Sequence, residues 1–343
     1  MTLRAKLFAF WMKRRPKNLS ATKVIAIAFA CIIVLGAGLL TLPSASRSGV
    51  SCGFLPALFT ATSATCVTGL SLYDTFTQWS GFGQIVIICL IQIGGLGFMS
   101  AATLFVFLLR KRIGLKQRLV MAQALSVSDM DGIVRLQKTV LKGSFAIEGL
   151  GAAVLFFRFL PEFGFSRALK WGLFHSISAF CNAGFDIFGC IAPGASLIEF
   201  NSDPVVILTL GALVVVGGLG FLVWEELVTI RKFKNFSVYT RLVLIMTASL
   251  LLLGMILYCL LEWNNPGTLG SMGVGDKLLN GLFQSITVRT AGFASIDQAL
   301  LTDASKGVSM LLMLIGGSSG STAGGVKTVT MVVLMLFLWT RAR

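Results

Sequence analysis

Long apolar segments alternate with short polar ones along the whole chain. Four of the apolar segments contain no charged residue, at 24–42, 82–109, 205–224 and 242–261. Each is long enough to cross about 30 Å of hydrocarbon at 1.5 Å per residue. Two further apolar segments are interrupted, one at 139–159 by charged side chains and one at 307–340 by glycines and Lys327. The pattern predicts an all-α membrane protein in which each of these segments forms a spanning helix.

A short phrase recurs three times between the predicted spans. It begins with Leu-Phe, continues with small and polar residues, and reaches a glycine nine or ten residues after the phenylalanine. The glycines are Gly69, Gly184 and Gly292, so the spacings are 115 and 108 residues. A phrase of about 12 residues is too short to span the bilayer, so we expect a half-helix that enters and leaves on one side. Repeats of this length predict equivalent helix–pore loop–helix units around a pseudo-symmetric pore.

The repeats divide the chain into six predicted parts. A cytoplasmic N-terminal segment covers 1–21 and is followed by the first unit. The other boundaries are the first helix–pore loop–helix repeat at 22–110, a cytoplasmic linker at 111–138, the second repeat at 139–231, a second linker at 232–240, and the third repeat at 241–343.

The charge distribution fits a membrane protein. Only 13% of residues are charged, where about 25% is usual in soluble domains. The net charge is +15, and Lys and Arg gather at 4–23, 110–118 and 231–241. These clusters flank the predicted spans, so the positive-inside bias places them and the N-terminus in the cytoplasm and the repeated phrases on the external side. The chain is therefore expected to be a multi-pass protein of the cell membrane, in contact with the lipid bilayer and not with nucleic acid.

Three tripeptides end at the repeated glycines: Val67-Thr68-Gly69, Asn182-Ala183-Gly184 and Thr290-Ala291-Gly292. A dehydrated alkali cation needs a ring of hard oxygen ligands, and backbone carbonyls supply these without a fixed charge in the membrane. Glycine reaches the backbone conformations that aim successive carbonyls inward. The preceding half-helix turns its partially negative C-terminal end toward the cavity, which favours a cation. Three such tripeptides in register predict a cation site made of main-chain oxygens.

Glycines also mark the second helix of each repeat. Gly94-Gly95-Leu96-Gly97 and Gly217-Gly218-Leu219-Gly220 occupy equivalent places, where we expect close packing of continuous helices. The third copy, at 316–327, has five glycines in twelve residues. Each glycine costs a helix about 1 kcal/mol relative to alanine. This helix is therefore predicted to break in the membrane and to form a flexible loop beneath the filter.

These motifs resemble the Trk/Ktr/HKT superfamily of potassium transporters, and in particular its shorter Ktr-type (KtrB) membrane subunit. The resemblance is carried by residues 62–71, 180–186, 289–293 and 316–327. It implies a K+-selective filter of four non-identical pore loops, in which Gly69 is the residue that K+-selective members carry. It also implies that 316–327 is the intramembrane gate.

The resemblance assigns roles to individual residues. The implied K+ filter consists of Val67, Thr68, Gly69, Leu70, Asn182, Ala183, Gly184, Phe185, Thr290, Ala291, Gly292 and Phe293. The implied gate consists of Gly316, Gly317, Ser318, Gly320, Ser321, Thr322, Gly324, Gly325 and Lys327. Arg289 is expected to support the pore loop or to act on passing ions. K+ is the implied transported ion and the implied metal; Na+ coupling is left open, and no cofactor is expected in this chain.

The resemblance further implies a homodimer on a cytoplasmic ring of nucleotide-binding regulatory (KtrA/TrkA-like) subunits. One departure is clear, because the family has four repeats and only three are seen here. A fourth glycine would fall near position ~400, while the sequence stops at Arg343. Either the chain is truncated and inactive alone, or a partner supplies the fourth hairpin; we favour truncation.

Three other interpretations stay open at this point. A secondary transporter with a midplane site would also use broken helices, although its repeats are usually inverted. A non-conducting fragment of the K+ transporter is a second. An intramembrane enzyme would need a catalytic dyad, and the chain has one histidine, His175, which we expect to make packing contacts or one hydrogen bond. Among buried charges, Glu148 is expected to pair with a basic neighbour.

Overall fold

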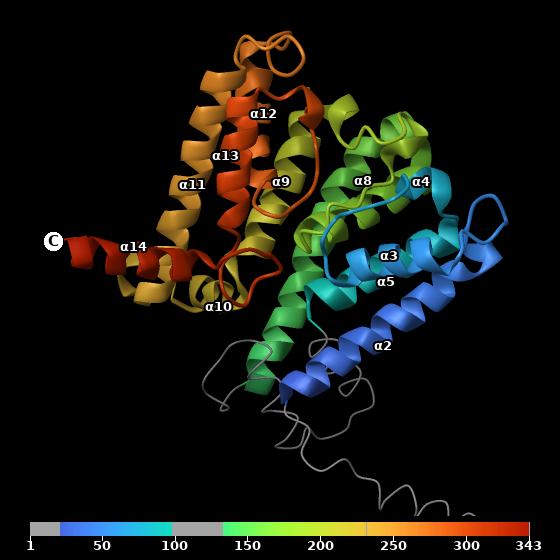
Figure 1. Cartoon of the computed structure of the whole chain (residues 1–343), viewed down its shortest axis with the longest axis horizontal. Helices are drawn as coiled ribbons and strands as arrows, with labels where there is room; N and C mark the ends of the chain where they lie inside the picture. Colours follow the sequence, from blue (N-terminus) through green and yellow to red (C-terminus); the bar gives the residue numbers. More distant parts are fainter. Residues whose placement is uncertain (1–20, 98–132, 231, 343) are drawn as a thin grey trace, which may run out of the picture.

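The computed structural model of the chain describes residues 21–97, 133–230 and 232–342. Within these ranges every regular element is a helix (Figure 1). The helices of four residues or more are α2 (Ala21–Thr41), α3 (Phe54–Thr65), α4 (Thr75–Gln78), α5 (Gly81–Gly95), α8 (Ile133–Phe180), α9 (Pro204–Leu219), α10 (Phe221–Ile230), α11 (Val238–Glu262), α12 (Val274–Thr287), α13 (Asp303–Leu314) and α14 (Thr328–Ala342). The predicted all-α architecture is confirmed.

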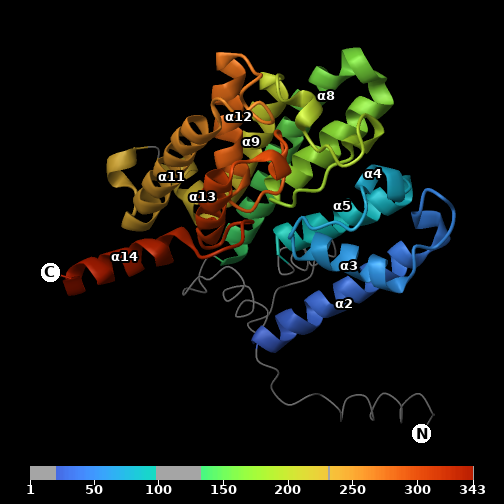
Figure 2. The ribbon, with the colours of Figure 1, turned by 45° about the horizontal axis from the view of Figure 1, so that its top comes forward.

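Each repeat contains a first helix, a pore helix and a second helix. In repeat one these are α2, α3 and α5, and in repeat three they are α11, α12 and α13. In repeat two the first helix and the pore helix are merged as α8, which is kinked near Pro161 and Gly164. The second helix of repeat two is α9. Repeat two lies between the other two repeats, and α14 projects away from the bundle (Figures 1 and 2).

A glycine in each first helix allows the same three-way contact. The glycines are Gly36, Gly151 and Gly254. A Cβ atom at any of them would lie within 3.1 Å of a leucine of the second helix, which is Leu90, Leu213 and Leu312 in turn. The pore helix meets the same glycine through Ala61, Ser176 and Ser285. Because the three sets coincide, residues of the three repeats can be placed in structural register.

The second helices begin in the same way. Ser80, Asp203 and Thr302 are their N-caps, and the side-chain oxygen of each accepts backbone N–H groups at 3.0–3.3 Å. Such caps satisfy donors that a helix start leaves without partners. These caps therefore fix the residues at which α5, α9 and α13 begin.

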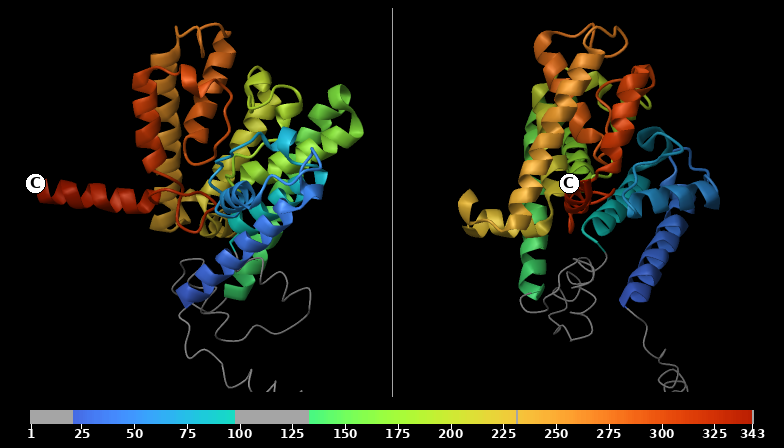
Figure 3. Two further views of the ribbon diagram at one scale, coloured as in Figure 1. Left: turned by 45° about the vertical axis from the view of Figure 1, so that its right-hand side comes forward. Right: turned by 60° about the vertical axis from the view of Figure 1, so that its left-hand side comes forward.

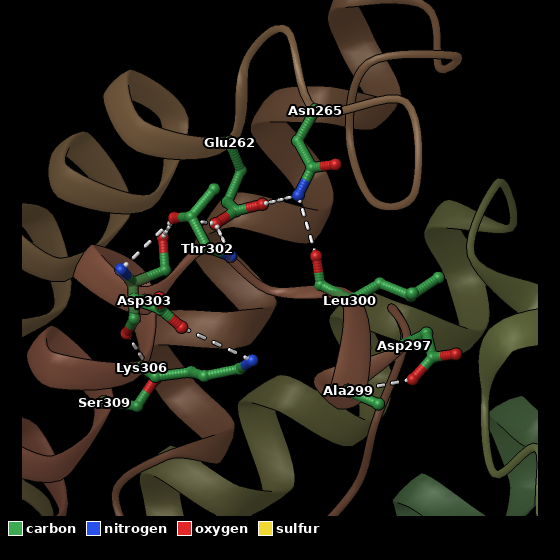
Figure 4. A network of polar contacts seen from close by, with 10 residues as sticks. Glu262, Asn265, Asp297, Ala299, Leu300, Thr302, Asp303, Lys306 and Ser309 are labelled. Atoms are coloured by element: carbon green, nitrogen blue, oxygen red, sulfur yellow. Dashed lines mark hydrogen bonds and ion pairs between the residues drawn. The ribbon is translucent and has the colours of Figure 1, made fainter.

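A buried carboxylate joins the helix ends of repeat three. Glu262, the last residue of α11, accepts hydrogen bonds from Asn265 Nδ2 at 2.6 Å and Thr268 Oγ1 at 2.7 Å. It also accepts from the backbone N–H and the hydroxyl of Thr302 at 2.9 and 2.7 Å. Asn265 donates in addition to Leu300 O at 2.8 Å (Figure 4). The start of α13 is therefore tied to the end of α11.

The second helices are broken where the sequence has its glycine clusters. α9 and α10 meet at 97°, and Gly220 at the break has φ of 93°. α5 ends at Gly95, and Gly97 has φ of 80°. The expected unbroken span at 205–224 is therefore wrong. In the predicted span at 82–109, helix α5 ends at Gly95, and residues 98–109 lie outside the described ranges. The close packing expected of these glycines is present, since Gly94 faces the carbonyl of Thr65 and Gly217 that of Phe180.

Within the described ranges, three helices are long and apolar enough to cross a membrane by themselves. They are α2, the helix at 137–180 and α11; α9 with α10 makes a fourth if the bent pair counts as one span. The helix breaks explain why fewer unbroken spans appear than the hydrophobic pattern predicts.

Candidate functional site

The three predicted loops have one backbone signature. We call them loop one (67–70), loop two (182–185) and loop three (290–293). In each loop the first and third residues have positive φ. The values are 55° and 75° for Val67 and Gly69, 57° and 69° for Asn182 and Gly184, and 68° and 86° for Thr290 and Gly292. Alternation of left-handed and right-handed residues turns successive carbonyls to one side of a chain, as a carbonyl ring requires.

The loop glycines lie next to one another. A Cβ atom at Gly69 would be 2.8 Å from Ala183 O, and one at Gly184 would be 2.7 Å from Ala291 O and 2.8 Å from Gly292 Cα. Loop two therefore lies between loop one and loop three. Segments separated by more than a hundred residues meet at backbone distance, where only glycine fits.

Hydroxyl side chains of the pore helices tie each loop to its helix. Ser178 Oγ donates to Phe185 O at 2.6 Å, and Thr287 Oγ1 donates to Phe293 O at 2.5 Å. In repeat one Thr68 Oγ1 donates to Ser63 Oγ at 2.9 Å. The sequence interpretation assigned no role to Ser63, Ser178 and Thr287, although a hydroxyl five or six residues before each glycine was a visible signal.

His175 supports the segment after loop two. Its Nδ1 lies 2.7 Å from Trp171 O, its Nε2 accepts from the N–H of Ile187 at 3.1 Å, and its ring stacks on Phe188 at 3.8 Å. The proton therefore belongs on Nδ1. The histidine makes two hydrogen bonds where packing or one was expected.

A cavity of about 770 Å³ lies beside the loops. It is lined by residues of loop one, loop three and the segment 320–324, together with Phe29, Phe221 and Met313. Leu70 of loop one faces it and is 63% exposed, whereas the equivalent Phe185 and Phe293 are almost fully buried. Loop two therefore has a neighbouring loop on each side, whereas the cavity separates loop one from loop three.

The segment 316–327, which we call the glycine loop, touches the site directly. Gly324 N donates to Thr290 Oγ1 at 3.1 Å, and Arg289 Nη2 donates to Gly316 O at 3.1 Å. Thr322 Oγ1 donates to Phe180 O at the end of the second pore helix at 3.0 Å. The loop is thus held beside loops two and three.

The break between α9 and α10 holds the other side of the glycine loop. The backbone N–H groups of Ser318 and Thr322 donate to Gly218 O at 3.0 Å and Gly217 O at 3.2 Å. Phe221 N donates back to Gly320 O at 2.9 Å. The last carbonyls of a helix have no partner inside that helix, so the end of α9 offers acceptors that this loop fills.

The glycine loop also closes on itself. Gly317 N donates to Gly324 O at 3.3 Å, Ser321 Oγ donates to Ser318 O at 2.7 Å, and Gly325 has φ of 72°. Lys327 Nζ donates to Ala323 O at 2.7 Å. Such a dense set of internal bonds makes the loop an ordered structure, in contrast to the flexible loop that its composition predicted.

Comparison with known proteins identifies the family of this chain. The family described as TrkH, cation transport protein, matches residues 4–342. The chain belongs to the TrkH family of cation transport proteins. It is accordingly a multi-pass membrane transport protein and not an enzyme, and the family resemblance is confirmed.

Two relatives of this TrkH-family chain are each 42% identical to it. The potassium/sodium uptake protein NtpJ of Enterococcus hirae aligns over 94% of this chain and 70% of its own length. The Ktr system potassium uptake protein B of Bacillus subtilis aligns over 98% and 73%. The crystal structure of the potassium transporter TrkH from Vibrio parahaemolyticus matches with a TM-score of 0.68 at 16% identity and supports the fold; the match covers 94% of this chain and 62% of that one.

Two charged residues of this TrkH-family chain lie differently from expectation. Arg289 donates to a carbonyl of the glycine loop, not to the pore loops. Glu148 has no ion pair with any residue that the structure describes and instead accepts hydrogen bonds from Gln92. The expected basic partner of Glu148 is therefore not present in that part of the chain.

Proposed function

We propose that this chain is the pore-forming membrane subunit of a K+ uptake system. The observation that carries the proposal is the contact of three loops with the same alternating backbone at Gly69, Gly184 and Gly292. Relatives whose names describe potassium uptake support K+ as the ion.

The residues of loops one, two and three would coordinate K+ through their backbone carbonyls. These oxygens replace the water shell of the ion without an ionised side chain. The pore helices end at the loops, so their partially negative C-terminal ends favour a cation there. The side chains of Thr68, Ser178 and Thr287 hold the loops in place and need not touch the ion.

The glycine loop 316–327 would be the gate. Its contacts with Thr290 and with the carbonyl of Phe180 keep it beside the ion path. Opening requires these bonds to exchange for others, and Arg289 limits how far Gly316 moves. Lys327 would close the base of the loop by its bond to Ala323 O.

The cavity between loops one and three leaves space for a further structural element. A fourth helix–pore loop–helix unit, from a longer form of this chain or from a partner, would fill the cavity between loops one and three. Backbone polar groups facing lipid cost several kcal/mol each. Closure of the ring would remove that cost and complete the ion coordination.

We further propose a homodimer that binds a nucleotide-binding regulatory ring at the cytoplasmic face, with the N-terminus on that face and the loops toward the exterior. The basic clusters at 110–118 and 231–241 support this orientation. Coupling to Na+ is part of the proposal, since one relative is named a potassium/sodium uptake protein.

The test is Rb+ uptake by K+-starved cells that lack their own uptake systems. The chain is expressed alone and joined to the part of the Bacillus subtilis relative that lies outside the aligned 73% of its length. We expect saturable Rb+ uptake in the joined form, and loss of uptake with Gly184→Val. Equal uptake in empty cells and in cells with well-expressed joined protein would refute the proposed function.

A further inference from the structure

A buried polar pair joins repeat one to repeat two inside the membrane. Gln92 on α5 donates through Nε2 to both carboxylate oxygens of Glu148 on α8, at 2.9 and 3.0 Å. Glu148 is 2% exposed. A carboxyl group at this depth is costly and rarely occurs without a functional reason.

The register of the repeats shows that this pair has no counterpart at the next junction. Counted from the first-helix glycines, Glu148 corresponds to Leu251 in repeat three. Counted from Gly94 and Gly217, Gln92 corresponds to Val215 in repeat two. Leu251 and Val215 are partly buried and pack against the main hydrophobic core. Apolar side chains thus occupy the equivalent positions at the junction of repeats two and three, whereas the first junction is polar.

The pair stands directly behind loops one and two. Gly94, two residues after Gln92, faces the carbonyl of Thr65 at the end of α3. Gly95 faces the side chain of Cys181, which precedes Asn182 of loop two, and Cys181 Sγ lies 3.9 Å from Gln92 Oε1. A shift of α5 against α8 therefore changes the separation of the two loops.

We propose that Gln92 and Glu148 form a positioning pair that sets the spacing of loops one and two and thereby the preference for K+ over Na+. The inference rests on the proposed K+ uptake function. The pair acts through α5 and the loop ends, and neither side chain touches the ion. A directional amide–carboxyl contact fixes the register of two helices more narrowly than an apolar contact does. The preference between two cations that differ little in size depends on such fine geometry of the carbonyl cage.

The test replaces the polar pair with the apolar residues of the other junction. The variants are Gln92→Val, Glu148→Leu, the double variant and Glu148→Gln, and Leu251→Val is the matched control. Rb+ uptake and its inhibition by Na+ are measured in the joined form, and thermal unfolding is followed in the purified protein. Either single apolar change leaves a buried polar group without its partner, so both lower Tm.

The double variant separates a positioning role from simple packing. We expect it to regain most of the Tm but to lose roughly threefold to tenfold in Rb+ over Na+ preference. Glu148→Gln keeps an acceptor and should keep the preference, and Leu251→Val should change Tm alone. A double variant with full Tm and an unchanged Rb+ over Na+ preference would overturn the positioning role. The proposed function would still hold in that case, provided that the wild-type protein takes up Rb+. Absence of uptake by wild type would overturn both.

Discussion

Loop one and loop two share a backbone signature but have different surroundings. Loop two lies between two other loops, with Ala183 fully buried and Phe185 3% exposed. Loop one borders the cavity, and its Leu70 is 63% exposed. In the right-hand view of Figure 3, repeat one (blue) and helix α11 of repeat three lie at opposite sides of the bundle. Since both loops have positive φ at the same two positions, the pore helix and the glycine set the backbone locally. The segments packed around each loop determine how tightly this backbone conformation is constrained.

The hydrogen bonds that hold loop one and loop two differ in the same way. Loop two is held by Ser178, by His175 through the segment after it, and by Thr322 below the pore helix. In the described part of repeat one, the hydroxyl of Thr68 binds the end of its own pore helix. Loop one should therefore tolerate changes that loop two does not.

The largest difference is expected for alanine at the two glycines. Gly184→Ala places a Cβ within 3.0 Å of three backbone atoms of loop three. Gly69→Ala places a Cβ within that distance of a single backbone atom of loop two, Ala183 O, at 2.8 Å. Both also suffer from positive φ. We expect Gly184→Ala to abolish the monodisperse peak in size-exclusion chromatography and Gly69→Ala to lower Tm with the peak retained. Equal behaviour of the two variants would contradict the comparison.

Gly69→Ser tests the role of loop one in ion choice. Val67, Thr68 and Leu70 border the cavity, so loop one can shift away from Ala183 O, which a Cβ at position 69 would meet at 2.8 Å. The protein should therefore fold while the carbonyl positions change. In the joined form we expect Rb+ over Na+ preference to fall by roughly tenfold. The measurement is competition of Rb+ uptake by Na+, with expression levels matched. An unchanged ratio would remove Gly69 from the filter.

Removal of single hydroxyl anchors should give smaller effects. Ser178→Ala leaves Phe185 O without its side-chain donor in a buried setting and should cost about 1–2 kcal/mol in stability. Thr68→Val removes a bond in a more open setting and should cost about 0.5 kcal/mol. Thermal unfolding in matched detergent compares them. A larger loss for Thr68→Val would reverse the proposed order of constraint.

The smallest effect is expected at the edge of the glycine loop. Tyr239 OH donates to Ser319 O at 2.9 Å, which joins the N-terminal end of α11 to that loop. Tyr239→Phe removes one half-buried hydrogen bond, worth about 0.5–1 kcal/mol. We expect faster Rb+ leak in resting cells with an unchanged Rb+ over Na+ ratio. A changed ratio with an unchanged leak would mean that this contact acts on the filter and not on the gate.

The sequence was sufficient to predict the repeats, the helical class and the meeting of Gly69, Gly184 and Gly292, because a period in the chain implies equivalent places in space. The break at Gly220 was not predicted, since the apolar run continues through it and the glycine loop, which bonds to the last carbonyls of α9, lies far away in the sequence. The partner of Glu148 also could not be predicted. That partner is 56 residues away, and no local pattern selects Gln92 from the other polar residues.

The most direct test of the central claim is to locate a bound cation. Anomalous diffraction from crystals of the joined form grown in Rb+ would show it. We predict a peak contacted together by backbone carbonyls of residues 67–70, 182–185 and 290–293. A Rb+ peak bound by carboxylates elsewhere, with none beside the three glycines, would contradict the account.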